Sequence, residues 1–265
     1  MLKRLADKHP DFVSQLTYQY RMHKDICQLS NDVVYKGKLK CANDLVANKI
    51  LKLVHFPFAF ENYSNKESLL WLTKAIDPSN AVSFLDTDMV NDKPNNPDEQ
   101  SKCFLESSNN RRSGIVNEAE AFIVISLIKG LVTCGLDVSS IGVISPFRAQ
   151  LRLLDEHESI HNWVKEGLEV STIDRFQGRD KSVIILSFVR SNTKGKVGHL
   201  LEDFRRLNVA VTRAKYKLIM VGSYSTLYKG SGALKLVLDR VVVKNHLIQL
   251  PSYTSIPSIP RITIN

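Results

Sequence analysis

The chain is organised around STIDRFQGRDKSVIILSFV, residues 171–189. Residues 182–189 are apolar or β-branched along nearly their whole length, which is typical of a strand buried on both faces. Gln177 and Gly178 lie just before this strand. A glycine lets backbone approach an anion closely because it has no Cβ atom, and a glutamine amide can orient a water or contact a phosphate oxygen. The stretch therefore predicts a phosphate-facing turn that leads into a core strand.

A second informative stretch is RRLNVAVTRAK, residues 205–215. It predicts a helix with one apolar face, formed by Leu207, Val211 and Ala214. Arg213 lies at the end of this helix, where a guanidinium can stabilise the charge that spreads over a transferred phosphoryl group. Such an arginine contributes about 10³–10⁵ in rate. The alternative is that Arg213 is a solvated cation that pairs with Asp203 or Glu202.

The rest of the chain alternates predicted strands with predicted helices. The strands are expected at 12–16, 81–85, 141–145, 168–172 and 247–250, and the helices at 24–34, 68–76, 118–133, from 146 onward and at 233–242. Such alternation implies parallel pairing with right-handed crossovers. We therefore expect a three-layer α/β domain over residues 1–250, with functional loops at the carboxyl ends of its strands. An insertion at about 56–113 should pack on one side, and 251–265 should form a disordered tail.

The composition restricts the class of protein. Hydrophobic residues make up 43% of the 265 residues, and 36 Lys and Arg against 27 Asp and Glu give a net charge of +9. A basic chain favours a polyanionic partner such as nucleic acid. No apolar run approaches the roughly 18 residues that a membrane span requires, so no membrane partner is expected. The four cysteines are scattered, which argues against a zinc site or a disulfide framework and fits a reducing compartment.

Three segments, in chain order, resemble motifs of superfamily one helicases. Residues 16–23, LTYQYRMH, are similar to motif IV in the branch that moves 5′ to 3′, residues 172–180 to motif V, and residues 207–215 to motif VI. The connector SFVRSN, residues 187–192, is similar to that of the DNA replication ATP-dependent helicase/nucleases. The resemblance covers roughly residues 1–250. It implies the second RecA-like motor domain of such an enzyme, a three-layer sandwich of the P-loop NTPase superfamily.

The resemblance also implies roles at a bound ATP. The residues that it assigns to the phosphates are Arg21, Arg213, Gln177 and Gly178. Tyr20 would stack on the adenine, and Asp180, where relatives often carry glutamate, would accept a hydrogen bond from the ribose. The alternatives are that Tyr20 is a core aromatic residue and that Arg21 is only an ion-pair partner.

Other residues are candidates for contact with a nucleic-acid backbone. The junction SPFRAQ, residues 145–150, joins a strand end to a helix start, and such junctions present donors to an anion. The candidates are Ser145, Arg148, Gln150, Ser171 and Thr172. For Arg148 the alternative is an exposed side chain at a capped helix start without contact to a ligand.

A complete motor also needs a phosphate loop, G-x-x-x-x-G-K-[ST], and an acidic pair for magnesium. Gly130 and Gly135 have the inner spacing of that loop, but Leu136 follows where lysine is required. The resemblance assigns the loop and the magnesium ligands to a first motor domain. We therefore expect ATP with Mg²⁺ as cofactors of the whole enzyme, and neither ATP hydrolysis nor unwinding by this chain alone. No iron–sulfur cluster is assigned to the chain, because its cysteines do not match the family's pattern.

The partners implied by the resemblance are single-stranded DNA, the first RecA-like domain of the same enzyme and a single-strand-binding protein, in the nucleus and also the mitochondrion. Two alternatives stay open. One is the second motor domain of an RNA helicase of the nonsense-mediated-decay branch, which shares motifs IV to VI. The other is a non-catalytic, truncated module that only binds nucleic acid.

Overall fold

The computed structural model describes residues 8–14, 16–61, 66–90, 106–109 and 114–251. The tail expected at 251–265 lies outside these residues from 252 onward, as do residues 91–105 and 110–113 of the insertion expected at about 56–113. Within the described ranges, no helix is long and apolar enough to cross a membrane.

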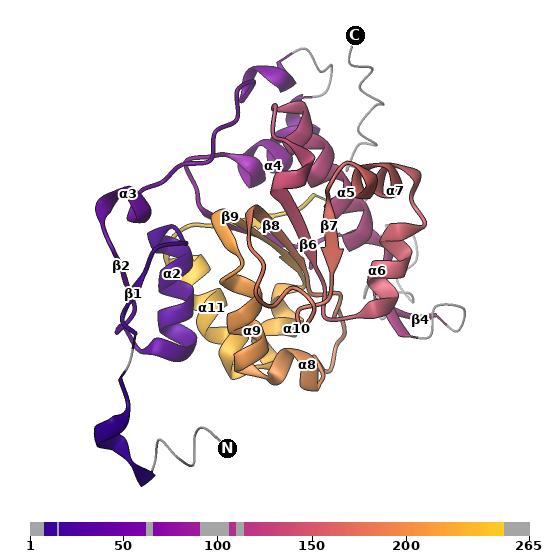
Figure 1. Ribbon diagram of the computed structural model, residues 1–265. Helices are drawn as coiled ribbons and strands as arrows, with labels where there is room; N and C mark the ends of the chain where they lie inside the picture. The colour runs from indigo at the N-terminus through magenta and orange to yellow at the C-terminus, as the bar shows by residue number, and fades with distance from the viewer. Residues whose placement is uncertain (1–7, 15, 62–65, 91–105, 110–113, 252–265) are drawn as a thin grey trace.

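A six-stranded parallel sheet forms the centre of the molecule (Figure 1), in the order β10-β3-β9-β8-β6-β7. Its strands are β3 (Val82–Asp86), β6 (Ile141–Ile144), β7 (Glu169–Ser171), β8 (Lys181–Ser187), β9 (Ala214–Gly222) and β10 (Leu247–Gln249). β8 pairs with β6 on one side and β9 on the other. Its residues 183–186 are apolar and buried, as predicted for a strand covered on both faces.

Two hydrophobic cores cover the two faces of the sheet. One core is formed with α4 (Lys66–Ile76), α5 (Glu118–Thr133), α6 (Arg148–Asp155) and α7 (Glu158–Lys165). The other is formed with α2 (Lys24–Ser30), α8 (His199–Glu202), α9 (Phe204–Val211), α10 (Tyr224–Gly230) and α11 (Gly232–Val243). Adjacent strand residues alternate between the cores, because Ile185 packs in the first and Ile184 in the second. The expected three-layer α/β class is confirmed.

The start of α5 is the one predicted from the sequence. The side chain of Asn117 accepts a hydrogen bond from the backbone N–H of Glu120 at 3.0 Å. This bond satisfies one of the amide groups that a helix start leaves without an intrahelical partner. The helix then continues over its apolar positions to Thr133.

The longest strand, β9, is missing from the elements predicted above. It lies between β3 and β8, although Lys215 and Lys217 interrupt its apolar sequence. Lys217 is fully buried because its Nζ donates to the backbone oxygens of Asp77 and Asn80, at 2.8 and 2.5 Å. Because α9 ends at Val211 and β9 begins at Ala214, Ala214 does not belong to the apolar face of the helix, contrary to the prediction.

The segment expected as an insertion at about 56–113 contributes to the centre of the domain instead. Its helix α4 packs in the first core, and its strand β3 lies between β10 and β9 in the sheet. The prediction of separate packing is therefore wrong for residues 66–86. The physical reason is the burial of every residue of β3, which only an inner strand achieves.

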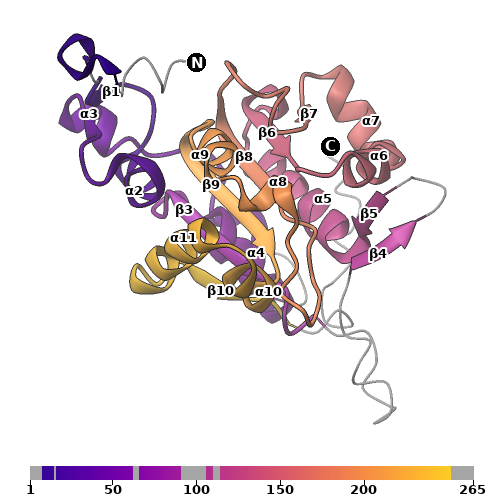
Figure 2. The same cartoon turned by 90° about the horizontal axis from the view of Figure 1, so that it is seen from below.

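The N-terminal region lies at one end of the molecule, opposite the hairpin of β4 (Glu106–Asn109) and β5 (Gly114–Asn117) (Figures 1 and 2). The strand predicted at 12–16 is wrong for residues 12–14 and 16, and residue 15 lies outside the described residues. Instead, β1 (Tyr18–Gln19) pairs in parallel with β2 (Lys40–Cys41). The Gln19 side chain accepts the backbone N–H groups of Arg21 and Met22 at 2.8 and 2.7 Å, which fixes the turn that presents Arg21.

Candidate nucleotide and nucleic-acid sites

A pocket of about 690 Å³ lies where the turn after β1, the start of β8 and the turn between α9 and β9 meet. Four residues predicted for the nucleotide line it: Tyr20, Arg21, Asp180 and Arg213. Arg21 and Arg213 are far apart in sequence, and the structure brings them to one opening. Asp180 directly precedes β8 and Arg213 directly precedes β9, so this pocket lies at the amino ends of the strands.

Asp180 connects the cations of this pocket. Its Oδ2 lies 3.1 Å from Arg21 Nε, and its Oδ1 lies 2.6 Å from Lys215 Nζ. Partial burial raises the pKa of Asp180, but the hydrogen bond from Lys215 and the charges of Lys215 and Arg21 outweigh it and hold the pKa below its usual value. Arg21 also donates to the backbone oxygen of Thr212 at 3.3 Å. Arg21 is thus an ion-pair partner and a pocket residue at the same time.

Arg213 is held by backbone and hydroxyl oxygens. Its guanidinium donates to the carbonyl oxygens of Val209 and Arg179 at 2.9 and 3.1 Å and to the Thr212 hydroxyl at 3.0 Å. Burial lowers its pKa, and the nearby charge of Arg21 lowers it further. An anion between the two guanidinium groups would relieve their repulsion.

The alternative pairing of Arg213 with Asp203 or Glu202 is wrong. Asp203 caps α9 by accepting the backbone N–H of Arg205 at 2.9 Å, and Glu202 lies 3.3 Å from His199 Nδ1. Both acidic side chains are occupied by local partners at the start of the helix, whereas Arg213 lies beyond its end.

Gln177 and Gly178 are not among the residues that line the pocket. Both are exposed, and Gly178 has a left-handed φ of 87°, which favours glycine. The carbonyl of Arg179, the next residue, accepts a hydrogen bond from Arg213. The turn therefore orients Arg213 through a backbone carbonyl, and the side chain of Gln177 is exposed to solvent.

Two lysines of the pocket were not assigned a role from the sequence. Lys215 could have been predicted, because it belongs to the segment that resembles motif VI. Lys49 follows the short helix α3 (Asp44–Ala47), and no sequence motif around it indicates a role in the pocket. Lys49 donates to the backbone oxygen of Arg21. Burial lowers the pKa of Lys49, and the charge of Lys215 lowers it further.

The chemistry of this pocket suits a polyphosphate. Four cationic side chains face one carboxylate, and they are Arg21, Lys49, Arg213 and Lys215. Tyr20 is 74% exposed at the pocket, so it is not a core aromatic residue, and its ring is open to a planar group. In the described part of the chain, no group of three or more His, Cys, Asp or Glu side chains could hold a metal ion.

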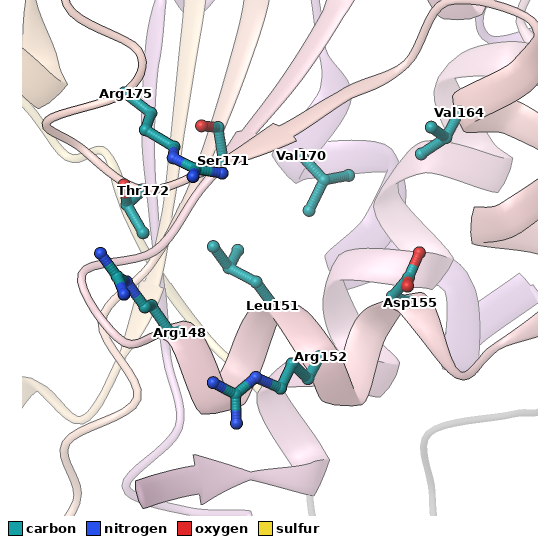
Figure 3. Close-up of a pocket in the computed structure, with 9 residues that line it drawn as sticks. All are labelled: Arg148, Leu151, Arg152, Asp155, Val164, Val170, Ser171, Thr172 and Arg175. Carbon is teal, nitrogen blue, oxygen red and sulfur yellow. The ribbon is translucent and has the colours of Figure 1, made fainter. Parts of the chain in front are cut away.

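A second pocket, of about 400 Å³, lies between the carboxyl end of β7 and helices α6 and α7 (Figure 3). Three of the predicted nucleic-acid residues line it: Arg148, Ser171 and Thr172. Arg152 and Arg175 line it too and were not predicted. Figure 3 shows Arg148 and Arg175 on either side of Thr172. Among the described residues, neither Arg148 nor Arg175 has an ion-pair partner.

Ser145 and Gln150 are buried and do not line this pocket. The Ser145 hydroxyl accepts the backbone N–H of Phe147 at 3.3 Å. Gln150 accepts the N–H of Asn117 at 2.8 Å and donates to its carbonyl oxygen at 2.9 Å. The prediction that these two side chains contact phosphodiesters is therefore wrong, because they hold the start of α6 in place.

The two pockets lie at opposite edges of the sheet, which corrects the expectation that all functional loops share the carboxyl edge. β7 and β8 are both parallel to β6, so the chain must return from the carboxyl end of β7 to the amino end of β8. Residues 172–180 make this crossover without a helix. The crossover therefore begins beside Arg148 at one edge and ends at Asp180 at the other, so one short segment contacts both pockets.

Comparison with known proteins supports the resemblance to helicases. A family model described as an AAA domain matches residues 1–225. The chain is 41% identical over 254 residues to the DNA replication ATP-dependent helicase/nuclease DNA2 of Xenopus tropicalis, covering 95% of this chain and 22% of that protein. It is 42% identical over 229 residues to the DNA2 of Saccharomyces cerevisiae, covering 86% and 14%. The chain thus spans about a fifth or less of the length of these relatives, and the resemblance inferred from the motifs is confirmed.

Proposed function

This chain belongs to the AAA domain family, and from that premise we propose that it is the C-terminal motor domain of an ATP-dependent 5′–3′ DNA helicase/nuclease. The relatives named above are DNA replication enzymes by name. We propose the same setting for this chain, with action in DNA replication and repair and a place in the nucleus. One observation carries the proposal: a single crossover, residues 172–180, joins a cationic pocket to an arginine-rich pocket.

The residues of the first pocket support a role at the terminal phosphate of ATP. ATP with Mg²⁺ supplies the phosphoryl group and the charge that the site must stabilise. Arg21 and Arg213 are oriented by Asp180 and by backbone oxygens before any ligand arrives, and such preorganisation lowers the cost of stabilising new charge. Tyr20 offers a ring to the adenine. Asp180 has both carboxylate oxygens engaged by cations, so a ribose hydroxyl would have to share one of them.

The residues of the second pocket support contact with single-stranded DNA. Arg148 and Arg175 are unpaired within the described residues and flank the Thr172 side chain. Guanidinium groups neutralise phosphates and release counterions, so the affinity should fall steeply with salt. Opening and closing of this domain against a first motor domain would shift the strand, and the crossover would transmit the nucleotide state between the sites.

The chain contains no G-x-x-x-x-G-K-[ST] sequence, so we propose that a first motor domain supplies the phosphate loop and the magnesium ligands. The purified chain should then bind single-stranded DNA but show no magnesium-dependent ATPase activity. An ATPase activity of the chain alone that is lost in Arg213→Ala would contradict the proposal that a first motor domain supplies the phosphate loop and the magnesium ligands.

The decisive test is a fusion in which this chain replaces the matching segment of the Xenopus tropicalis relative. The fusion should hydrolyse ATP, and Arg213→Ala should lower the ATPase rate about 10³-fold or more. Arg205→Ala is the matched control, because Arg205 is an exposed arginine of α9 outside the pocket. Equal ATPase rates of the fusion and its Arg213→Ala variant, both folded by circular dichroism, would overturn the proposal.

The same fusion separates the alternatives. Unwinding of a DNA duplex with a 5′ single-stranded tail, and weaker unwinding of the matching RNA duplex, is the expected outcome. Preference for RNA would favour the nonsense-mediated-decay branch. Single-strand binding without any effect of ATP would favour a non-catalytic module.

A further inference from the structure

The pocket between α6, α7 and β7 has an apolar middle that phosphate contact does not explain. Figure 3 shows the side chains of Leu151 and Val170 pointing toward each other across it, with Val164 at the far side. Val164 is 42% exposed, and Leu151 and Val170 are only partly buried. Apolar side chains that face a cavity of about 400 Å³ lose the burial that would otherwise stabilise them.

Two arginines and one carboxylate lie at opposite ends of this pocket, and Arg152 lies on α6 between Arg148 and Asp155. Arg148 and Arg175 lie at one end beside Thr172, and Asp155 lies at the other end beyond Leu151 (Figure 3). Among the described residues, the Asp155 carboxylate has no hydrogen-bond or ion-pair partner. A cavity with a partly apolar wall, two arginines at one end and one free acceptor at the other matches a planar ligand with a phosphate on one side and a donor on the opposite side.

We propose that this pocket takes one unstacked nucleobase of the bound single strand, with Leu151, Val164 and Val170 against the base and Asp155 at its exocyclic edge. The inference rests on the proposed function, because it requires that a single strand binds at this edge. Arg148 and Arg175 hold the adjoining phosphates. Single-stranded bases are available for such contacts because their edges and faces are not covered by a complementary strand.

Asp155 gives the pocket a base preference. An ionised carboxylate only accepts hydrogen bonds, so it accepts from the exocyclic N4 amino group of cytosine. Uracil presents the O4 oxygen at the same position, and two acceptors repel each other. The chain therefore binds cytosine-containing strands more tightly than uracil-containing strands of the same length and charge.

The test measures binding of the purified 265-residue chain to two homo-oligomers of about ten nucleotides, oligo-dC and oligo-dU, by fluorescence anisotropy. These differ at the base edge and not in backbone or methyl groups. The chain should prefer dC by about threefold to tenfold, the range that one hydrogen bond supplies. Asp155→Asn should abolish the preference, because an amide can accept from N4 of cytosine and donate to O4 of uracil. Glu166→Gln, an exposed carboxylate at the end of α7 outside the pocket, should leave it unchanged.

A second variant tests the apolar wall. Leu151→Gln should weaken binding of both oligomers without altering the salt dependence, since no charge changes, and Leu236→Gln on α11 is its matched control. Equal affinities for dC and dU in the wild-type chain, or an Asp155→Asn variant with the wild-type preference, would overturn this inference while leaving the proposed function intact. Failure to bind either oligomer would overturn both.

Discussion

A Cβ atom on Gly142 would lie 2.7 Å from Cζ of Phe176, closer than real Cβ contacts allow. Gly142 lies inside β6, and Phe176 is a fully buried residue of the crossover 172–180. The missing side chain on β6 therefore creates the space through which the crossover passes from one edge of the sheet to the other.

Replacing Gly142 by alanine should destabilise the chain by about 1–3 kcal/mol, the usual effect of overpacking a dense core. The new methyl group would also meet Ile184 Cδ1 at 2.8 Å, so neither neighbour can move freely. Urea unfolding followed by circular dichroism measures the change. Gly232→Ala is the control, because its Cβ would meet nothing within 4 Å; equal unfolding midpoints for the two variants would contradict the packing argument.

Asp180→Asn should lower the turnover number of the fusion by up to about 10²-fold, because small displacements of a catalytic group are costly. The amide cannot hold Arg21 and Lys215 by charge, as the carboxylate does at 3.1 and 2.6 Å. The expected change is in kcat more than in KM, since the cations themselves remain. Asp180→Glu should recover most of the rate; a variant that changes only KM would show that Asp180 acts on nucleotide affinity alone.

Arg148→Ala and Arg175→Ala should each lower the slope of log affinity against log salt by about one for single-stranded DNA. Each variant removes one guanidinium that is unpaired among the described residues. Titration of a labelled oligomer at several salt concentrations gives the slopes, with Arg205→Ala as the control. Unchanged slopes in both variants would mean that the strand binds elsewhere.

The stability of the chain should depend on pH through Lys217. Burial lowers the pKa of this amino group from 10.5 to about 7 in the folded chain, so unfolding takes up a proton between these two pH values. The free energy of unfolding therefore rises with pH across this window, by about 1.4 kcal/mol per pH unit relative to Lys217→Met. Urea unfolding of both chains from pH 6 to pH 10, values spanning roughly that window, measures the difference, and parallel pH profiles would contradict it.

Much of the fold could be predicted because local patterns and final structure agree. The helix from Glu118 to Thr133 carries its own cap in Asn117 and its own apolar spacing. β9 was missed because Lys217 contradicts its pattern, and only the carbonyls of Asp77 and Asn80 make that lysine acceptable in the core. β3 was placed outside the core for a related reason, since nothing local distinguishes an inner strand from an added one.

The sequence by itself determined the α/β class and the elements around residues 171–189, because hydrophobic periodicity is a property of the chain. The resemblance of its motifs also predicted that Arg21, Asp180 and Arg213 lie at one site, and all three line one pocket. Only the tertiary structure decided that Lys49 joins those residues, that Gln177 faces outward and that the two pockets occupy opposite edges of the sheet. The physical reason is that strand order depends on pairing between distant segments of the chain, which the local sequence does not specify. β7 and β8 lie on either side of β6 and both run parallel to it, so residues 172–180 must return from the carboxyl end of one strand to the amino end of the other.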